Sequence, residues 1–423
     1  MAYTRRVIDE ELDALFGELP AILLDGPKGV GKTATALERV KTVLRLDDPS
    51  QLQIVMADPD GVLRSEPPVL VDEWQRFGPI WDAVKRNIDN PNTSGRFLLT
   101  GSAYVPDVPI HSGSMRIHEI RMRPMTLPER GVVNPTVSLQ ALSEGVREVG
   151  GYIENFGLSQ YVNEIVASGF PGIRKMSTHA QKALLSSYLS NIVNKDFPEA
   201  GHKVRKPDAV LAWLRAYAAA TATTTSYEKI RNAANPGNET IPAKTTTLAH
   251  IEVLRMLRIL DEVPAWLPGS NFLAELAQAP KHHLVDPALA VRALGLNAGK
   301  LLKGDSGTIV YPKEGELLGR LFESLVTMSI RVFAQSIGAT VSHLRTRDGK
   351  HEVDIILVTE TGKVIGIEVK LAPTVTSDDV KHLMWLRDNA KTDVIDLLVV
   401  TTGDKAFRRS DGVAVVPLSL LGV

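Results

Sequence analysis

The chain has 423 residues, of which 44% are hydrophobic and 23% are charged, as in a soluble globular protein of two or three domains. Its 48 basic residues nearly balance its 49 acidic residues, which excludes a protein-wide positive field for nucleic acid or membranes. The absence of cysteine excludes disulfides, cysteine-bound zinc, iron–sulfur clusters and a cysteine nucleophile. Acidic residues interrupt the N-terminal segment and no long apolar stretch occurs, so we expect no signal peptide, no membrane contact and a cytoplasmic location.

The first predicted element is a short apolar strand at residues 21–25, which leads into a glycine-rich loop and then a helix over 34–40. The loop matches G-x-x-x-x-G-K-[ST] in full, in the strand–loop–helix order that a phosphate-binding loop requires. Its residues are Gly26, Pro27, Lys28, Gly29, Val30, Gly31, Lys32 and Thr33. We expect Lys32 to reach the β- and γ-phosphates and Thr33 to bind Mg²⁺. The alternative is a chance glycine-rich turn; the phosphate-loop interpretation predicts ATP and Mg²⁺ as cofactors.

A second apolar strand, at residues 69–71, ends in two adjacent carboxylates, Asp72 and Glu73. Following a phosphate loop by some forty residues, Asp72 is placed to hold Mg²⁺ and Glu73 to polarise the attacking water. A third predicted strand, at residues 96–99, ends in Thr100. Thr100 either senses the γ-phosphate or caps the turn that follows.

Four segments together resemble the AAA-like P-loop ATPases of bacteria and archaea that carry an uncharacterised restriction-nuclease-like C-terminal domain. These segments are Asp72–Gln75, Leu99–Ser102, His111–Arg116 and Ile117–Glu129. The resemblance implies an arginine after the fourth strand that meets the γ-phosphate, and the matching position is Arg116. Ser114 and Met115 precede it where the family has small residues. The alternative for Arg116 is a surface residue of a strand.

A glycine- and proline-punctuated stretch over 131–151 marks a boundary, and helical patterns follow it. Residues 207–257 contain several short helices, and the run 259–266 is expected to form a small strand or wing. This arrangement resembles a winged helix-turn-helix whose helix beginning near Lys244 would face a DNA groove. Helix-turn-helix folds also serve only to pack against proteins, and this alternative stays open.

The last third holds a second candidate site on a helix over 315–326 and a hairpin of strands at 351–358 and 364–370. Its residues are Glu323, Asp354, Glu368 and Lys370. They resemble the restriction-endonuclease-like motif of an acid, a spacer and Glu-x-Lys, with Val353 in place of the family's proline. The three carboxylates would hold a metal ion, and Lys370 would orient or activate water. The alternative is an internal ion-pair network without catalysis.

The sequence therefore predicts three parts. An α/β P-loop ATPase with a parallel sheet spans 1–135, a helical winged-helix region spans 136–285, and an α/β restriction-endonuclease-like domain spans 286–423. One hypothesis is a Mg²⁺-dependent ATPase that controls a nuclease-like, nucleic-acid-directed module. The other is a nucleotide-dependent protein-interaction switch with an inactive nuclease-like domain. ATP or ADP is the expected ligand, and DNA, RNA or a second copy of the chain are candidate partners. The sequence leaves open whether Arg116 acts in its own chain or in a neighbouring one.

Overall fold

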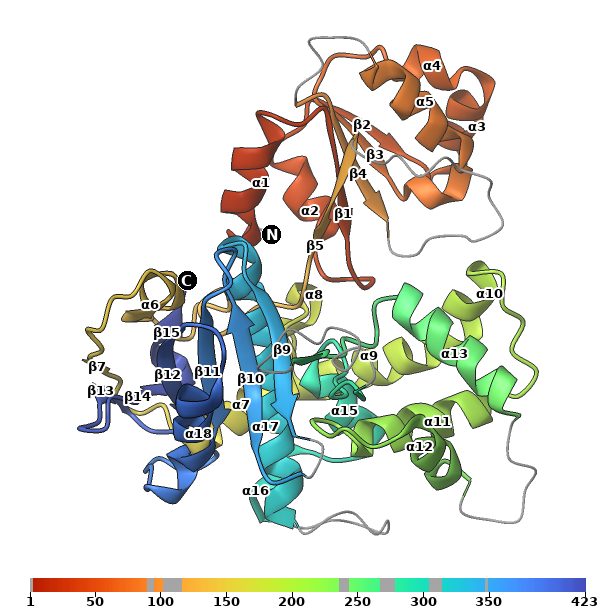
Figure 1. Cartoon of the computed structure of the whole chain (residues 1–423). Coiled ribbons are helices and arrows are strands. Elements are labelled where there is room, and N and C mark those ends of the chain that lie inside the picture. Colours follow the sequence, from red (N-terminus) through yellow and green to blue (C-terminus); the bar gives the residue numbers. More distant parts are fainter. Residues whose placement is uncertain are drawn as a thin grey trace.

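The computed structural model describes residues 3–89, 95–101, 116–235, 243–266, 278–303, 314–346 and 349–423. Ser102 and residues 111–115, which carry part of the family resemblance, lie outside the described residues. Figure 1 shows the N-terminal lobe above an assembly of helices and a second, larger sheet. Within the described residues, no helix combines the length and the apolar character needed to cross a membrane.

The N-terminal lobe is built on a five-stranded sheet of order β2-β3-β4-β1-β5 in which every pairing is parallel. Its strands are β1 (Ala21–Asp25), β2 (Thr42–Arg45), β3 (Val69–Asp72), β4 (Phe97–Gly101) and β5 (Ile117–Arg121). The central strands are apolar on both faces because helices cover both faces. This arrangement confirms the predicted α/β class with a parallel sheet.

Alternate residues of each central strand point to opposite faces and therefore enter different cores. Ile22, Leu24 and Leu98 pack with α1 and α2, whereas Val71 and Leu99 pack with α3 and α5. The helices and the short 3-10 turn of this lobe are α1 (Ile8–Phe16), α2 (Lys32–Leu37), α3 (Pro49–Ala57), α4 (Pro59–Val62), η1 (Trp74–Phe77) and α5 (Pro79–Ile88). The parallel register brings the carboxyl ends of β1, β3 and β4 to one edge, where the phosphate loop begins.

The central region is helical, and several of its helices start at a side chain that caps them: Ser177 before α9, Ser226 before α12 and Asp286 before α15. Its elements are α6 (Leu139–Ser143), α7 (Leu158–Ala167), α8 (Pro171–Arg174), α9 (Thr178–Asn191), η2 (Ile192–Asp196), α10 (Phe197–Glu199), α11 (Pro207–Ala219), α12 (Tyr227–Ala233), α13 (Lys244–Met256), α15 (Pro287–Ala293) and α16 (Ala298–Lys303). The turn η2, which is π-helical, continues α9 directly.

After α13 the chain forms a narrow antiparallel pairing between residues 259–263 and 281–285, which we call the bridge strip. Leu260 pairs with Leu284, and Val263 pairs with Lys281 through two backbone hydrogen bonds of 2.9 Å. Residues 265–266, expected to belong to a small strand or wing, form the short strand β8, which pairs in parallel with β9 of the larger sheet. The winged-helix assignment itself stays a prediction.

The larger sheet has eight strands in the order β7-β13-β14-β12-β11-β10-β9-β8. Its strands are β7 (Gly151–Tyr152), β8 (Ala265–Trp266), β9 (Thr340–Arg345), β10 (Glu352–Val358), β11 (Val364–Val369), β12 (Val394–Thr401), β13 (Lys405–Arg408) and β14 (Ala414–Pro417). Strands β9, β10 and β11 are antiparallel neighbours, whereas β11, β12 and β14 pair in parallel. The edge strands β7 and β8 come from the segment 136–285, so the larger sheet recruits chain from the central region.

Two helices cover opposite faces of this sheet. The long helix α17 (Glu314–Ser336) shares a core with Ile355 and Ile367, and α18 (Lys381–Asn389) shares another with Ile356. Gly366 of β11 lies directly under α18, where an added Cβ would come 2.6 Å from a methyl group of Leu386. The remaining short elements are η3 (Asp378–Val380), η4 (Leu418–Leu420) and a two-stranded pairing of β6 (Val137–Ser138) with β15 (Leu421–Gly422).

Candidate functional site

The phosphate loop follows β1 and bends at glycines. Replacing one of these glycines with any other residue would strain the backbone. Gly29 and Gly31 have φ angles of 79° and 108°, in the left-handed region that favours glycine. A Cβ on Gly26 would collide with the backbone oxygen of Met122. These conformations turn the loop back so that α2 begins at Lys32.

Lys32 is buried within this loop, with its side chain turned toward the loop's own backbone. Its Nζ donates hydrogen bonds to the backbone oxygens of Gly26 and Pro27 at 2.7 and 2.9 Å. Burial lowers the pKa of Lys32 to about 8, and Glu73, Asp25 and Asp72 only partly offset this effect. A negatively charged ligand beside Nζ would favour the charged form of Lys32.

Thr33, Asp72 and Thr100 converge at the edge of the sheet. Thr33 Oγ1 donates to Asp72 Oδ1 at 2.8 Å, and the buried Thr100 hydroxyl donates to the same oxygen. Asp72 lies opposite Thr100 in the register of β3 and β4, which explains this contact. A hydroxyl and a carboxylate side by side are oxygen donors of the kind that Mg²⁺ prefers. The residues present therefore fit a bound Mg²⁺ ion.

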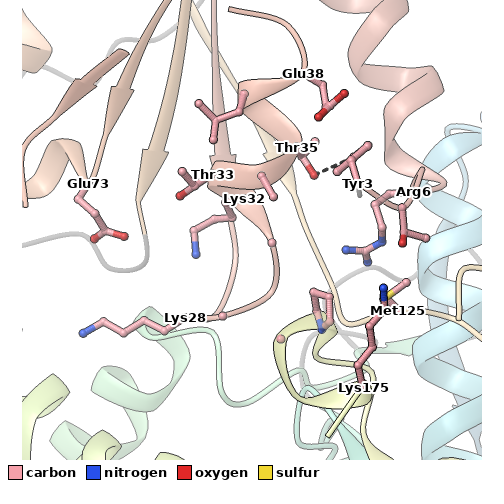
Figure 2. A pocket seen from close by; sticks show the side chains of 17 residues that line it. Tyr3, Arg6, Lys28, Lys32, Thr33, Thr35, Glu38, Glu73, Met125 and Lys175 are labelled. Carbon is pink, nitrogen blue, oxygen red and sulfur yellow. Dashed lines mark hydrogen bonds between the residues drawn. The ribbon is translucent and has the colours of Figure 1, made fainter. Parts of the chain in front are cut away.

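Glu73 follows Asp72 in a left-handed backbone conformation, with φ of 57°. This conformation is uncommon for a residue with a side chain, and it turns the chain sharply between β3 and η1. Glu73 Oε2 accepts a hydrogen bond from Gln75 Nε2 at 2.5 Å. Figure 2 shows the Glu73 carboxylate at the same end of the pocket as the Lys32 amine and Thr33.

Lys32, Thr33 and Glu73 line a cavity of about 600 Å³ that extends from the phosphate loop to the N-terminal segment and the central helices. Its lining residues are Tyr3, Thr4, Arg6, Lys28, Gly29, Gly31, Lys32, Thr33, Ala34, Thr35, Leu37, Glu38, Glu73, Met125, Pro171, Gly172 and Lys175. Figure 2 shows Glu73 and Lys32 toward one end, and Tyr3, Arg6, Met125 and Lys175 toward the other. Sequence reasoning missed the second group. The Gly-Phe-Pro-Gly segment at 169–172 was a visible signal for two further lining residues, Pro171 and Gly172.

Two basic residues anchor the loop to other parts of the chain. Arg6 is buried; its guanidinium donates to the backbone oxygen of Val30 at 3.1 Å and pairs with Glu129 at 2.9 Å. Lys28 extends from the loop toward the central helices, where its Nζ pairs with Asp196 at 2.6 Å and Glu199 at 2.7 Å. The phosphate loop therefore contacts both the N-terminal segment and the helical region.

Arg116 does not lie at this site. It immediately precedes β5, whose first residue pairs with Ala21 at the start of β1, whereas the phosphate loop follows the end of β1. Five strand residues separate the two positions by about 16 Å along the sheet. Arg116 pairs instead with Asp89 at 3.1 Å, and both side chains are nearly half exposed. The prediction that Arg116 contacts the phosphate bound in its own chain is therefore wrong, because the strand register places Arg116 at the sheet edge opposite the phosphate loop.

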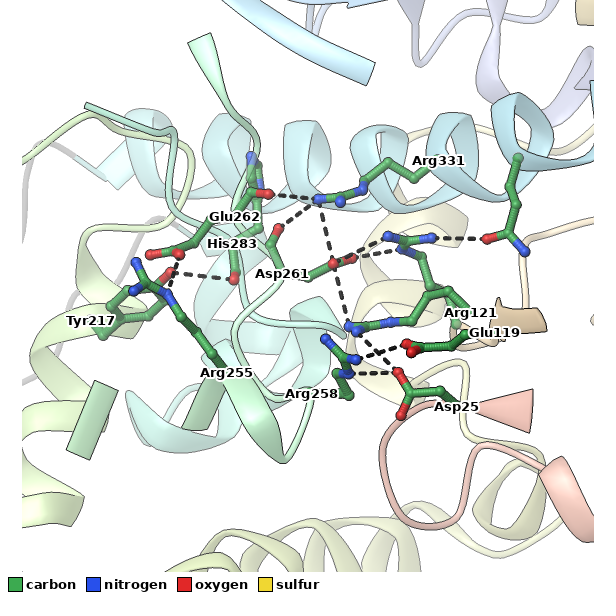
Figure 3. Close-up of polar contacts among 12 residues, drawn as sticks. Asp25, Glu119, Arg121, Tyr217, Arg255, Arg258, Asp261, Glu262, His283 and Arg331 are labelled. Carbon is green, nitrogen blue, oxygen red and sulfur yellow. Dashed lines mark hydrogen bonds and ion pairs between the residues drawn. The ribbon is translucent and has the colours of Figure 1, made fainter. Parts of the chain in front are cut away.

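A network of ion pairs lies directly beneath the phosphate loop and reaches the other parts of the chain (Figure 3). Asp25, the last residue of β1, pairs with Arg258 at 2.5 Å and with Arg121 at 3.7 Å. Arg121 also pairs with Asp261 of the bridge strip at 3.5 Å. Arg331 of α17 pairs with the same Asp261 at 3.4 Å. The network thus connects β1, the bridge strip and α17.

Asp261 is the centre of this network. Its nearest partner is Arg123, whose Nε lies 2.8 Å from Asp261 Oδ2. Burial alone would raise the pKa of Asp261, but the guanidinium groups of Arg123, Arg331 and Arg121 hold it well below its usual range. Burial in turn lowers the pKa of Arg121 to about 10. Asp261 and Arg121 are therefore both charged at neutral pH.

The C-terminal carboxylates surround a lysine that sequence reasoning missed. Lys281 of the bridge strip is 1% exposed, and its Nζ lies 2.8 Å from Glu323 Oε1, 3.1 Å from Asp354 Oδ1 and 3.5 Å from Glu352 Oε1. Burial disfavours the charged form of Lys281, but these carboxylates raise its pKa above the usual range. Burial and Asp354 raise the pKa of Glu323 to about 8.

The remaining members of the predicted metal site lie beside this cluster. Asp354 Oδ2 accepts the backbone N–H of Val369 at 2.9 Å, and Lys370 Nζ pairs with Glu368 Oε2 at 2.9 Å. Glu368 is buried, and burial raises its pKa well above the usual range. Across the described ranges, no group of three or more acidic or histidine side chains is arranged to hold a metal ion. The metal role of Glu323, Asp354 and Glu368 stays a prediction, and the ammonium group of Lys281 lies between the first two.

Comparison with protein families divides the chain into three matched regions. The AAA domain family (AAA_14) matches residues 18–130. Two domains of unknown function, DUF8612 and DUF4143, match residues 158–300 and 318–421. No curated protein matches the chain.

Solved structures with some similarity include the Walker-type ATPase PABY2304 of Pyrococcus abyssi, at 16% identity and a TM-score of 0.41, covering 69% of this chain and 96% of that one. The ORC2 protein of Aeropyrum pernix, in ADPNP–ADP complexes, has 12% identity and a TM-score of 0.31, with coverage of 76% and 94%. Drosophila ORC bound to DNA has 14% identity and a TM-score of 0.25, with coverage of 68% and 94%. The family match and the phosphate-loop geometry define an AAA-type P-loop ATPase domain at residues 18–130.

Proposed function

We propose that the protein binds ATP with Mg²⁺ at the phosphate loop and hydrolyses it. The observation that supports this proposal is the convergence of Lys32, Thr33 and Glu73 at one end of the 600 Å³ cavity, where Thr33 is also hydrogen-bonded to Asp72. No structural need explains why a buried lysine, a hydroxyl and two carboxylates should gather at one sheet edge. Their placement matches the tasks of phosphate binding, ion binding and water activation.

Each residue has a defined task in this proposal. Lys32 would exchange its bonds to the loop carbonyls for phosphate oxygens, while Thr33 and Asp72 would hold Mg²⁺ and Thr100 would orient Asp72. Bound Mg²⁺ neutralises charge on the phosphate oxygens. Glu73 would accept a proton from the attacking water, because its carboxylate lies at the phosphate end of the cavity.

We further propose that the nucleotide state is communicated to the rest of the chain. Lys28 joins the loop to the central helices, and Asp25 joins the strand beneath it to the bridge strip and α17. A change in the loop on binding or hydrolysis would therefore alter contacts in both other regions. This supports a nucleotide-dependent switch, in which the C-terminal α/β domain binds a protein or nucleic-acid partner.

Metal-dependent cleavage of DNA or RNA by the C-terminal domain is the second candidate. The adjacency of Glu368 and Lys370, as expected for a restriction-endonuclease-like site, favours it. The position of Lys281 favours the switch. Loss of DNA or RNA cleavage in Lys370→Ala would support the second candidate; cleavage at the parent rate would assign the activity to another site.

The ATPase proposal is tested with two variants and a matched control. Lys32→Ala should abolish binding of a fluorescent ATP analogue, whereas Glu73→Gln should bind it normally and hydrolyse ATP about 10²-fold more slowly. Glu66→Gln is the matched control and should leave both properties unchanged. Glu66 is exposed and lies just before the start of β3, at the end away from Glu73. Equal hydrolysis rates in the parent and Glu73→Gln would remove Glu73 from its proposed role.

A further inference from the structure

Lys281 reaches the C-terminal carboxylates from outside the domain that carries them. It lies on the bridge strip, where its backbone N–H and C=O both bond to Val263 at 2.9 Å. Its side chain extends to Glu323 of α17 and to Glu352 and Asp354 of β10. Because the backbone is held at both polar groups and the side chain is 1% exposed, the ammonium group is fixed in place.

The cluster would be unstable without a cation. Glu323 and Asp354 are mostly buried, with side chains 14% and 16% exposed, and Glu368 lies close enough for Asp354 to affect its ionisation. Gathering carboxylates in a buried site is costly unless a positive charge compensates them. Lys370 pairs with Glu368, but among the described residues only Lys281 contacts both Glu323 and Asp354.

The position of this ammonium conflicts with a divalent metal between the same oxygens. Mg²⁺ binds carboxylate oxygens at about 2.0–2.1 Å, within the space that Lys281 Nζ fills at 2.8 and 3.1 Å. An ion there would also meet a fixed positive charge. We infer that Lys281 takes the cation position of this carboxylate cluster, so that the C-terminal domain holds its acidic residues together without a divalent metal.

This inference stands apart from ATP hydrolysis and bears on the role of the C-terminal domain. A domain with a built-in cation keeps the shape of a nuclease-like site and has no metal to activate water. It therefore serves as a binding surface in the proposed switch. Nucleotide binding is measured separately, in matching variants that keep Asp72, so the failure of one proposal is distinguishable from the failure of the other.

The test measures thermal unfolding without nucleotide at about pH 8, where Glu323 ionises. An Asp72→Asn background excludes metal bound at the phosphate loop. The parent of this series should show no change in Tm with Mg²⁺ or Mn²⁺. Adding Lys281→Met should lower Tm by about 5 °C or more, because it leaves buried carboxylates uncompensated. Mn²⁺ should then restore much of this loss in a concentration-dependent way.

Two controls separate the charge of Lys281 from its packing. Adding Asp354→Asn to Lys281→Met should abolish the response to Mn²⁺. Lys363→Met removes an exposed lysine from the turn between β10 and β11, and it should change neither Tm nor the metal response. A clear metal-induced rise in Tm for the parent, or no metal response in Lys281→Met, would overturn the inference.

A further variant covers the case in which Lys281→Met does not fold. The double change Lys281→Met with Glu323→Gln removes one positive and one negative charge, so it should be more stable than Lys281→Met alone. If the double variant is equally unstable or also fails to fold, the lysine stem is needed for packing rather than for its charge, and the inference fails.

Discussion

Lys28 of the phosphate loop and Asp196 of the turn η2 form an ion pair with an Nζ–Oδ1 distance of 2.6 Å. Tyr188 of α9 strengthens this junction, because its hydroxyl donates to the backbone oxygen of Lys28 at 3.2 Å. The loop proposed to hold the phosphates is therefore tied to the helical region by both side chain and backbone. A phosphate that attracts Lys28 would compete directly with Asp196.

We expect Lys28 and Asp196 to be energetically coupled, with a larger coupling energy in the absence of nucleotide than in its presence. Asp196 is 10% exposed and Lys28 37% exposed at the side chain, so a double-mutant cycle of Lys28→Met and Asp196→Asn should give a coupling energy of about 1 kcal/mol. Urea unfolding measures it. Saturating ATP analogue should reduce the coupling, and an increase would contradict the competition described above. The exposed pair Lys41–Glu66 is the control, with a smaller coupling expected.

Asp261→Asn should be among the most damaging single changes in the chain. It would leave Arg121, Arg123 and Arg331 around a neutral side chain, and breaking a buried ion pair in this way costs about 3–5 kcal/mol. We expect a large fall in the denaturation midpoint. Asp411→Asn removes the partner of Arg409 at a more exposed site and should cost less than about 1 kcal/mol. Similar losses for the two variants would show that the Asp261 network contributes little.

Glu323 should make stability fall as pH rises. Its pKa is raised to about 8 by burial and by Asp354, whereas an unfolded glutamate ionises near about 4.3. Between these values the folded state retains a proton that the unfolded state has released, so the free energy of unfolding decreases with increasing pH. Glu323→Gln removes this contribution, and its Tm should decline less between about pH 5 and 8. Parallel Tm profiles for the parent and the variant would contradict this assignment.

The phosphate-loop site was predictable from sequence because its signals are local. The strand at 21–25, the loop at 26–33 and the acids after β3 each lie within a few residues, and the parallel sheet that joins them follows from their order. The C-terminal hairpin was predictable for the same reason, since two short apolar runs and a glycine turn define it within twenty residues.

The charge partners were not predictable, because they are distant in the sequence. Lys281 contacts Glu323 and Asp354 across 42 and 73 residues, and Arg123 contacts Asp261 across 138. No periodicity indicates which buried lysine enters which cluster. The position of Arg116 depended on strand register: parallel pairing of β5 with β1 places the start of β5 away from the loop. That register is a property of the folded sheet.

The remaining question about Arg116 is whether it acts on a neighbouring copy of the chain. At the edge of the sheet opposite the phosphate loop, it cannot meet a phosphate bound in its own chain, and it is exposed enough to contact another molecule. We therefore expect Arg116→Ala to leave the ATPase rate per chain unchanged at dilutions where the protein is monomeric. A fall in that rate at dilution would contradict the strand register described above.

A role in a neighbouring copy predicts a different pattern at high concentration. The parent's rate per chain should rise with concentration, and that of Arg116→Ala should not, because an arginine supplied by a neighbour stabilises charge on the transferred phosphoryl group. Mixing Arg116→Ala with Lys32→Ala should then restore activity, since the first chain keeps an intact phosphate loop and the second keeps the arginine. Asp89→Asn frees Arg116 from its ion pair and should not reduce this complementation. Equal concentration dependence in the parent and Arg116→Ala, with no recovery on mixing, would leave Arg116 as a surface residue of the strand.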